Sequence, residues 1–381
     1  MRKIVFLMIT AICHSQNYKP TISARVDTTK LNIKKVYDLY TNYLNSKPDS
    51  IYSNSFWKKS EVEEALKNKY LKIDRAAEIM FNGMKSDEFI EYYQPKIIQI
   101  DSVDINRYQI KTIYNADCPE NEYKKYTPSY ITKLYAVKDN DGNFKLENCL
   151  NYLTKNWKKL KKGTITYVIH PACFYNKIQV KKAELFIKEI SKRFDLEKTD
   201  FTYYVLPNSD ELGKLYNFEY WNFYIGGQTI IQKKEIFTTY SNFDYNHEIV
   251  HMIFKKNDTI KLDNTILFSE GIATWLAGAG YNESFENGLT RTSKKLKQYN
   301  KITFDDITNF KIRNEFDNTI LYITGAVICK MIYEKHGKDG IWEFYYATKE
   351  NYKNILENLF EKKINEIEID VFNYILNETN P

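Results

Sequence analysis

Cysteine is scarce in this chain of 381 residues, which has five of them and no Cys-x-x-Cys pair. That absence excludes cysteine zinc ribbons and thioredoxin-type redox motifs. Cys118 and Cys149 lie at the ends of predicted strands in one segment. A disulfide between them is one pairing open to the chain in an oxidising compartment, although the sequence alone does not fix the connectivity.

Long apolar runs are also lacking, since no segment approaches the roughly 20 residues that a membrane helix needs. The N-terminus reads MRKIVFLMITAICHSQNYKP, in which two positive charges precede a short apolar run that ends at Ile12. Cys13 and Ser15 stand at −3 and −1 of a cut before Gln16, a layout typical of a secretory signal peptide over residues 1–15. We expect an exported protein, periplasmic or secreted, without a membrane span. Lipidation of Cys13 is a minor alternative, because Ile12 is bulky where a lipobox has a small residue.

The sequence has no long basic run, and its charges nearly balance: 55 Lys and Arg face 49 Asp and Glu, for a net charge of +6. Basic residues interleaved with 32 tyrosines are one feature of nucleic-acid surfaces. A composition rich in Lys, Asn, Ile and Tyr is equally that of proteins from AT-rich genomes. We therefore expect no nucleic-acid partner. The chain is 43% hydrophobic, which is enough for folded cores and excludes disorder.

The first half of the chain has the pattern of a small α+β domain. Apolar spacing predicts helices over residues 31–46 and about 59–84. Four strand-like segments follow, at 96–105, 108–116, 130–139 and 143–153. We assign an N-terminal α+β domain to residues 16–155, loosely similar in its order of elements to nuclear-transport-factor-2-like (NTF2-like) domains. The polar stretch KNWKKLKKG, residues 155–163, is the predicted domain boundary.

The second predicted domain, residues 164–381, begins with alternating elements and becomes mostly helical. We expect a strand over 164–171, a helix over about 175–193 and another strand over 201–207. A long helix is predicted to end at Gly337. The expected fold class is therefore α+β, with a small sheet in this domain and a mostly helical C-terminal part.

The segment DYNHEIVHMIF, residues 244–254, holds two of the five histidines, four positions apart. Residues at i and i+4 share one face of a helix, so His247 and His251 are placed to bind one metal ion, with Glu248 beside them. This is the HExxH arrangement of zinc hydrolases. The alternative is a chance match on an ordinary buried helix, because the remaining residues of the segment would make an apolar core face.

A third ligand would complete a catalytic zinc site, which takes three protein ligands and leaves one position for water. The extended HExxHxxGxxH motif of metzincins is excluded, because Phe254 and Asn257 stand where it needs glycine and histidine. Glu270, in LFSEGIATWLAG, lies inside an otherwise apolar run, with 18 residues between it and His251. We predict that it is the third ligand. The alternative is a surface glutamate that stabilises a helix start.

With these motifs, residues 164–345 resemble the thermolysin-like gluzincin peptidases, nearest in pattern to the aminopeptidase N branch and its peptidase MA-like relatives. The resemblance implies one zinc ion per chain, bound by His247, His251 and Glu270. It implies Glu248 as general base and peptides or proteins as substrates. The resemblance covers only the second half of the chain.

The same branch has a Tyr-x-Lys-Gly-Ala stretch whose tyrosine stabilises the tetrahedral intermediate. In YITGAV, Tyr322 matches that tyrosine, but Thr324 replaces the lysine. Thr274 replaces the aspartate that orients the first histidine in thermolysin, so support for His247 must come from elsewhere.

The stretch YIGGQTIIQ has Gly226 and Gly227 but lacks the glutamate that binds a substrate's free amine in aminopeptidases. We expect it to be an edge strand along which a peptide lies. Aminopeptidase activity is therefore not implied, and endo- and exopeptidase remain open. The principal alternative function is a non-catalytic binding or surface protein that retains a metallopeptidase scaffold, and a zinc hydrolase of other substrates is a further one.

Overall fold

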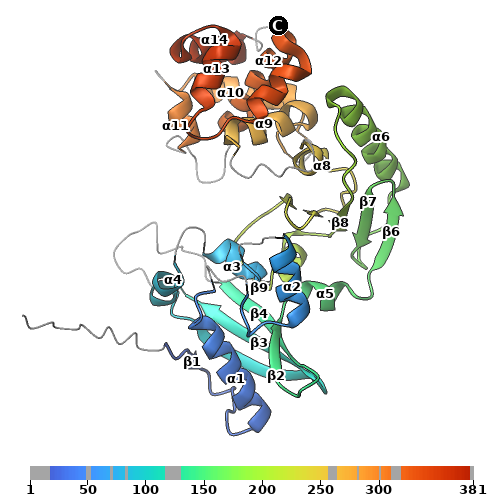
Figure 1. Ribbon diagram of the computed structural model, residues 1–381, viewed down its shortest axis with the longest axis vertical. Helices are drawn as coiled ribbons and strands as arrows, with labels where there is room; N and C mark the ends of the chain where they lie inside the picture. Colours follow the sequence, from blue (N-terminus) through green and yellow to red (C-terminus); the bar gives the residue numbers. More distant parts are fainter. Residues whose placement is uncertain are drawn as a thin grey trace, which may run out of the picture. The chain divides into compact units, whose positions relative to one another are not determined.

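The chain divides into two compact units. The computed structural model describes residues 18–48, 53–68, 72–81, 85–115, 130–255, 264–280, 283–299, 302–309 and 319–377. The first unit comprises residues 1–152 and 213–222, and the second comprises residues 153–212 and 223–381 (Figure 1). The predicted signal peptide, Cys13 and Cys118 lie outside the described residues. Each unit has one small sheet and the C-terminal part is helical, which confirms the predicted α+β class.

The first unit is built on a six-stranded sheet with helices. Its helices are α1 (Leu31–Leu44), α2 (Lys59–Asn68), α3 (Arg75–Met80), α4 (Ser86–Tyr93) and, at the division between units, α5 (Cys149–Thr154). Its strands are β1 (Thr21–Ile22), β2 (Lys96–Asp104), β3 (Arg107–Tyr114), β4 (Tyr130–Lys138), β5 (Phe144–Glu147) and β9 (Phe218–Tyr220). Strands β2 to β5 form an antiparallel meander, β1 pairs in parallel with β2, and β9 pairs with β4.

Helix α1 forms because its apolar residues fall on one face. Val36, Tyr40, Tyr43 and Leu44 are buried at positions i, i+4, i+7 and i+8, the spacing of an amphipathic helix. They pack in a core that includes Trp57 and the inward side chains of β2, β3 and β4. The predicted helix over 31–46 is thus found almost at its expected bounds.

Two predictions for the first half were wrong in part. The single helix predicted over 59–84 is two helices, because the side chain of Asp74 caps α3 by accepting a hydrogen bond from Ala76 N. The strand predicted over 143–153 ends at Glu147. Helix α5 then begins, with the backbone N–H of Cys149 donating to Asn217 Oδ1 at 2.8 Å. Cys149 is a buried free thiol, so the disulfide considered for it is not formed.

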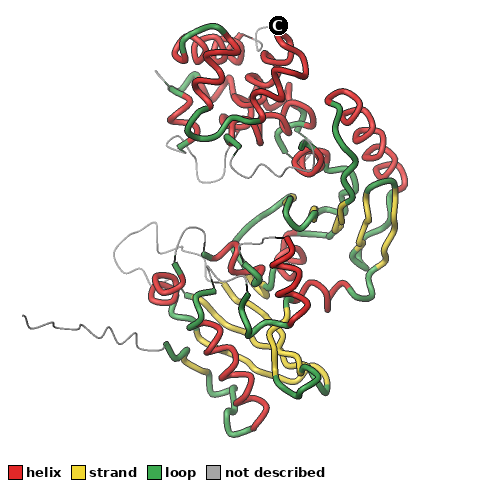
Figure 2. Tube along the Cα trace, in the orientation of Figure 1, coloured by secondary structure: helices red, strands yellow, loops and turns green. Residues whose placement is uncertain are grey.

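The second unit is built on a five-stranded sheet and a group of helices, drawn in red in Figure 2. Its strands are β6 (Lys158–Lys162), β7 (Ile165–Ile169), β8 (Phe201–Val205), β10 (Gly227–Ile230) and β11 (Glu235–Thr238). Its helices are α6 (Lys177–Phe194), α7 (Ser209–Leu215), which leads out of the unit, α8 (Asn246–Ile253), α9 (Ile266–Ala277), α10 (Phe285–Leu296), α11 (Phe304–Thr308), α12 (Thr319–Tyr345), α13 (Tyr352–Phe360) and α14 (Ile364–Asn377).

The order of the second sheet is β10-β11-β8-β7-β6. The three central strands are parallel, and β6 and β10 are antiparallel edges. The stretch 155–163, predicted to be a boundary, mostly forms β6, whose lysines are suited to an edge strand. Residues 213–222 belong to the first unit, so the second unit is formed by two separate stretches of sequence.

Helices α9 and α12 cross with their backbones in contact. A Cβ atom on Gly271 would lie 2.4 Å from Gly325 C, and one on Gly325 would lie 2.3 Å from Leu267 O. Only glycine permits this approach at both positions. Helix α12 has non-helical dihedral angles at Gly337 (φ 63°, ψ −150°), so the predicted helix end is a kink between two helical segments. Within the described residues, no helix is both long and apolar enough to cross a membrane.

Candidate metal centre

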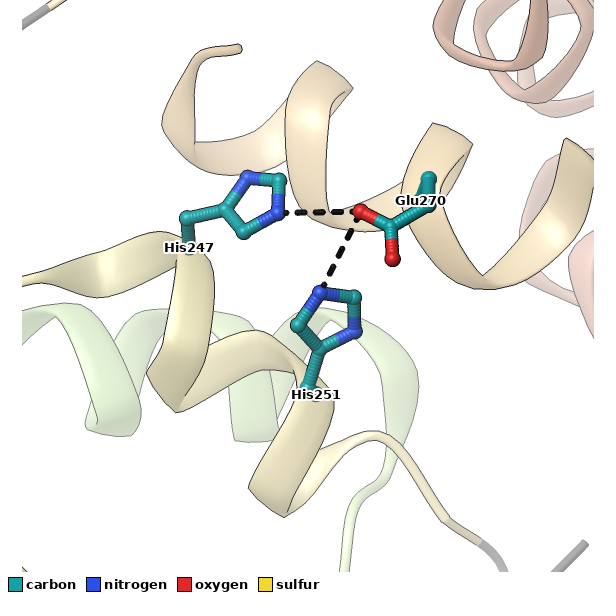
Figure 3. A group of neighbouring side chains, drawn as sticks. All are labelled: His247, His251 and Glu270. Atoms are coloured by element: carbon teal, nitrogen blue, oxygen red, sulfur yellow. Dashed lines mark hydrogen bonds and ion pairs between the residues drawn. The ribbon is translucent and has the colours of Figure 1, made fainter. Parts of the chain in front are cut away.

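The three predicted metal ligands lie together between α8 and α9. Nε2 of His247 is 3.3 Å from Oε2 of Glu270, and Nε2 of His251 is 3.5 Å from the same oxygen. Figure 3 shows both imidazole rings directed at the carboxylate. The three potential ligand atoms lie within 4.8 Å of one another. Two imidazole nitrogens and one carboxylate oxygen are the donor set of a His2Glu catalytic zinc site, so these residues fit the metal that the sequence predicted.

The orientation of His247 is fixed by a backbone carbonyl. Its Nδ1 donates a hydrogen bond to Gly278 O at 2.8 Å, which leaves Nε2 as the nitrogen that faces Glu270. Gly278 has φ 95°, in the left-handed region, and a Cβ there would lie 2.0 Å from Glu283 O. Thr274 takes no part in this support, and its buried Oγ1 has no hydrogen-bond partner among the described residues. The carbonyl of Gly278 therefore orients the ring of His247.

The electrostatics of the cluster favour a cation. Burial opposes protonation of His251, but the Glu270 carboxylate outweighs it and raises the pKa of His251 to about 9. Burial would raise the pKa of Glu270, but the two imidazoles outweigh it and hold that pKa far below its usual value. A positive charge is therefore strongly favoured at the position that these side chains share.

Glu248 lies next to the ligands and is anchored from the sheet. It is 8% exposed, and its Oε2 accepts a hydrogen bond of 2.7 Å from Thr229 Oγ1 on β10. The Thr229 hydroxyl also lies 3.0 Å from Glu248 O, so one strand residue contacts both the side chain and the backbone of Glu248. A Cβ on Gly227 would lie 2.9 Å from Glu248 Cγ, whereas one on Gly226 would have only Tyr245 Oη nearby, at 4.0 Å. Gly227 lets β10 approach α8 closely.

Tyr322, on α12, lies beside His247. Its ring is stacked on that of His247, with centroids 5.9 Å apart. A cavity of about 440 Å³ opens over the cluster, and it is lined by all three predicted ligands, Glu248, Tyr322 and residues 227–229 of the edge strand, among others. The structure thus brings six of the seven predicted site residues to one cavity, and Gly226 is not among the residues that line it.

Three contributors to this site were not predicted from the sequence. Thr229 and Gly278 act through hydrogen bonds to Glu248 and His247, and Gly271 sets the helix crossing beside Glu270. The only sequence signals for them are their positions in the YIGGQT and SEGIATWLAG stretches.

Comparison of the chain with models of known protein families and with curated protein sequences finds no match.

Proposed function

We propose that this chain is a zinc-dependent hydrolase of peptide bonds. The observation that carries the proposal is the convergence of His247, His251 and Glu270 on one point, with Glu248 beside them at the wall of a cavity. A structural metal site is closed by four protein ligands, whereas three ligands at a cavity are typical of a catalytic site. The N-terminal sequence supports the further proposal that the protein is exported.

Zinc bound by these residues would supply Lewis-acid polarisation of a carbonyl and an activated water. Glu248 has one carboxylate oxygen held by Thr229, which leaves the other to accept a proton and pass it to the leaving amine. Tyr322 would donate a hydrogen bond to the developing oxyanion. The edge strand β10 offers backbone groups to an extended peptide beside Glu248, as expected for a substrate that adds a strand.

The test compares the wild-type chain with Glu248→Gln on a diverse peptide mixture, read by mass spectrometry, after zinc loading and metal analysis. We expect cleavage by the wild type only and equal zinc content in both proteins, because Glu248 is not a ligand. The cleavage rate of Glu248→Gln should be lower than that of the wild type by about 10²–10⁴-fold. Cleavage at equal rates by the variant would disprove the role of Glu248.

A second variant separates chemistry from metal binding. Tyr322→Phe should lower kcat by ~10²–10³ and leave zinc content unchanged, as for the loss of one oxyanion donor. An unchanged kcat would show that Tyr322 is only a packing residue. Zinc bound by a wild type that cleaves no peptide would favour a binding scaffold instead.

A further inference from the structure

The positive charge of this chain is concentrated in one segment of the second unit. Residues 155–198 contain twelve basic and four acidic side chains, a net charge of +8. The whole chain carries +6, so all its other residues together sum to −2. The segment contains β6, β7 and α6, which lie beside one another (Figure 1). A local excess of this size favours an anionic partner at this surface.

Helix α6 presents a mixed basic and apolar face to solvent. Its exposed residues all fall within an arc of about 140° at 3.6 residues per turn. They are Lys177, Ile178, Lys181, Lys182, Leu185, Lys188, Glu189 and Lys192, and we call them the α6 outer face. Ile178 is 71% exposed and Leu185 is 56% exposed, while Phe174, just before the helix, is 90% exposed. Apolar side chains flanked by lysines are typical of a helix that lies in a membrane interface.

Several lysines of this face are placed unfavourably within the helix, although Lys192 lies in its last turn, where a cation is favourable. Lys177 and Lys181, like Lys188 and Lys192, are like-charge pairs at i and i+4, which weaken a helix. The first turn has no acidic residue, and Lys177 stands there against the helix dipole. Among the described residues, these four lysines form no ion pair. Their charges would be stabilised by an anion outside the chain.

A cavity adjoins the C-terminal half of the same face. It has a volume of about 440 Å³, and Lys162, Lys188, Lys192 and Lys198 stand at it together with apolar side chains such as Leu196. One carboxylate, Glu184, also lines it. The lysines match the headgroup of an anionic lipid, and the apolar side chains match its acyl chain.

We propose that the α6 outer face docks on a bilayer that contains anionic lipid. Phe174, Ile178 and Leu185 enter the interface, and the lysines contact the headgroups. A nucleic acid or other polyanion would use the lysines, but it would leave three exposed apolar side chains in water. The proposal stands independently of the metal centre.

The test is flotation of the full chain with vesicles of phosphatidylcholine alone or mixed with phosphatidylglycerol. Binding is expected only with phosphatidylglycerol, and it should weaken as salt is added. Lys177→Gln together with Lys181→Gln should weaken binding about 25-fold, or fivefold for each lysine. The matched pair Lys294→Gln and Lys297→Gln, exposed residues at the end of α10, removes the same charge elsewhere and should leave binding unchanged.

A second pair distinguishes a bilayer from a polyanion. Ile178→Ser together with Leu185→Ser should weaken vesicle binding about tenfold or more, because apolar area is lost, and should leave binding to heparin unchanged. The proposal would be overturned if the two lysine pairs lost vesicle binding equally or if the apolar pair had no effect on it. It would also be overturned if the wild type did not bind vesicles with phosphatidylglycerol. Every variant carries the same apolar N-terminus, so the differences report α6, and thermal melts verify that each variant is folded.

Discussion

Each unit of this chain buries a cluster of polar side chains, and the two clusters differ in what their carboxylates face. In the first unit, Glu61 accepts hydrogen bonds from the backbone and side chain of Asn148, at 3.0 and 2.7 Å. Asp74 accepts from Asn217 at 3.0 Å, and Asn217 also donates to Asn148 at 2.6 Å. These donors are neutral amides that are hydrogen-bonded to one another, and Tyr43 Oη also donates to Asp74 at 3.0 Å. A cation, Arg75, also acts on Glu61, but its charge is outweighed by burial.

In the second unit, the carboxylate of Glu270 faces two imidazoles, and the group lines a cavity. The pKa values follow from this difference. In the first unit, burial raises the pKa of Glu61 to about 7 and also raises that of Asp74, despite their hydrogen bonds. In the second, the imidazoles lower the pKa of Glu270 in spite of its burial. A buried carboxylate therefore indicates a cation site only when basic ring nitrogens and an opening accompany it.

Breaking the first cluster should have the largest effect. Asn148→Ala removes the side-chain hydrogen bonds to Glu61, Ile73 O, Arg75 N and Asn217. Glu61 keeps the backbone N–H of residue 148 and Asn217 keeps Asp74, whereas the buried groups of Ile73 and Arg75 lose the partner that Asn148 gave them. We expect the first unit to lose about 5 kcal/mol of stability, at 1–3 kcal/mol for each unsatisfied group. Hydrogen exchange read by mass spectrometry would locate the loss. Asn106→Ala, an exposed change in the same unit, is the control. Zinc binding that falls with Asn148→Ala would show that the clusters are coupled.

The second cluster can be broken by changing the spacing of two helices, without replacing any of the proposed ligands. Gly325→Ala places a Cβ where Leu267 O now lies 2.3 Å away, so α9 must move from α12 and carry Glu270 with it. We expect a loss of about 3–4 kcal/mol in the second unit, at the upper end of overpacking costs, together with loss of zinc. Gly280→Ala, whose Cβ would meet no atom within 4 Å, is the matched control. Retention of full zinc affinity by Gly325→Ala would separate the helix crossing from the site.

The pH dependence of stability sharpens the same comparison. Because the folded pKa of Glu61 is raised from 4.5 to about 7, the folded state binds its proton more tightly than the unfolded state does. The contribution of Glu61 to the free energy of unfolding is fully present below pH 4.5. It is lost as the pH rises to 7, and the loss is at most about 3 kcal/mol. Glu61→Gln should flatten the stability profile between these values, measured by urea unfolding. A variant with the wild-type slope would assign that slope to other groups.

The meeting of the three proposed ligands was predictable because side-chain spacing on a helix determines which residues share a face. His247 and His251 lie on one turn of α8, and Glu270 follows on the next helix. The support of His247 was not predictable, because Gly278 contributes a carbonyl, which every residue has, and only the fold places it 2.8 Å from the ring. Glu248 and Thr229 likewise meet only once β10 packs on α8.

The same distinction applies to the fold. Helix α1 was predictable from its own residues, because its apolar side chains recur at the spacing of one helix face. The break near Cys149 depends on a hydrogen bond with a distant residue, from Cys149 N to Asn217, whereas the break near Asp74 comes from a local cap on Ala76 N. Asn217 lies close to Cys149 because β9, which follows Asn217 directly, pairs with β4. Local periodicity carries no signal for a partner that lies 68 residues away.

The smallest expected effect tests whether a backbone carbonyl can replace a carboxylate as the support of a metal-binding histidine. Gly278→Ala forces a side chain into a left-handed position, with its Cβ 2.0 Å from Glu283 O, so the carbonyl must turn away from His247 Nδ1. We expect zinc affinity to fall about 10- to 100-fold, the usual cost of losing such a hydrogen bond. Competition with a chromogenic chelator measures it, again beside Gly280→Ala. If both variants bind zinc like the wild type, the ring of His247 is held by its packing against Tyr322, and the hydrogen bond is incidental.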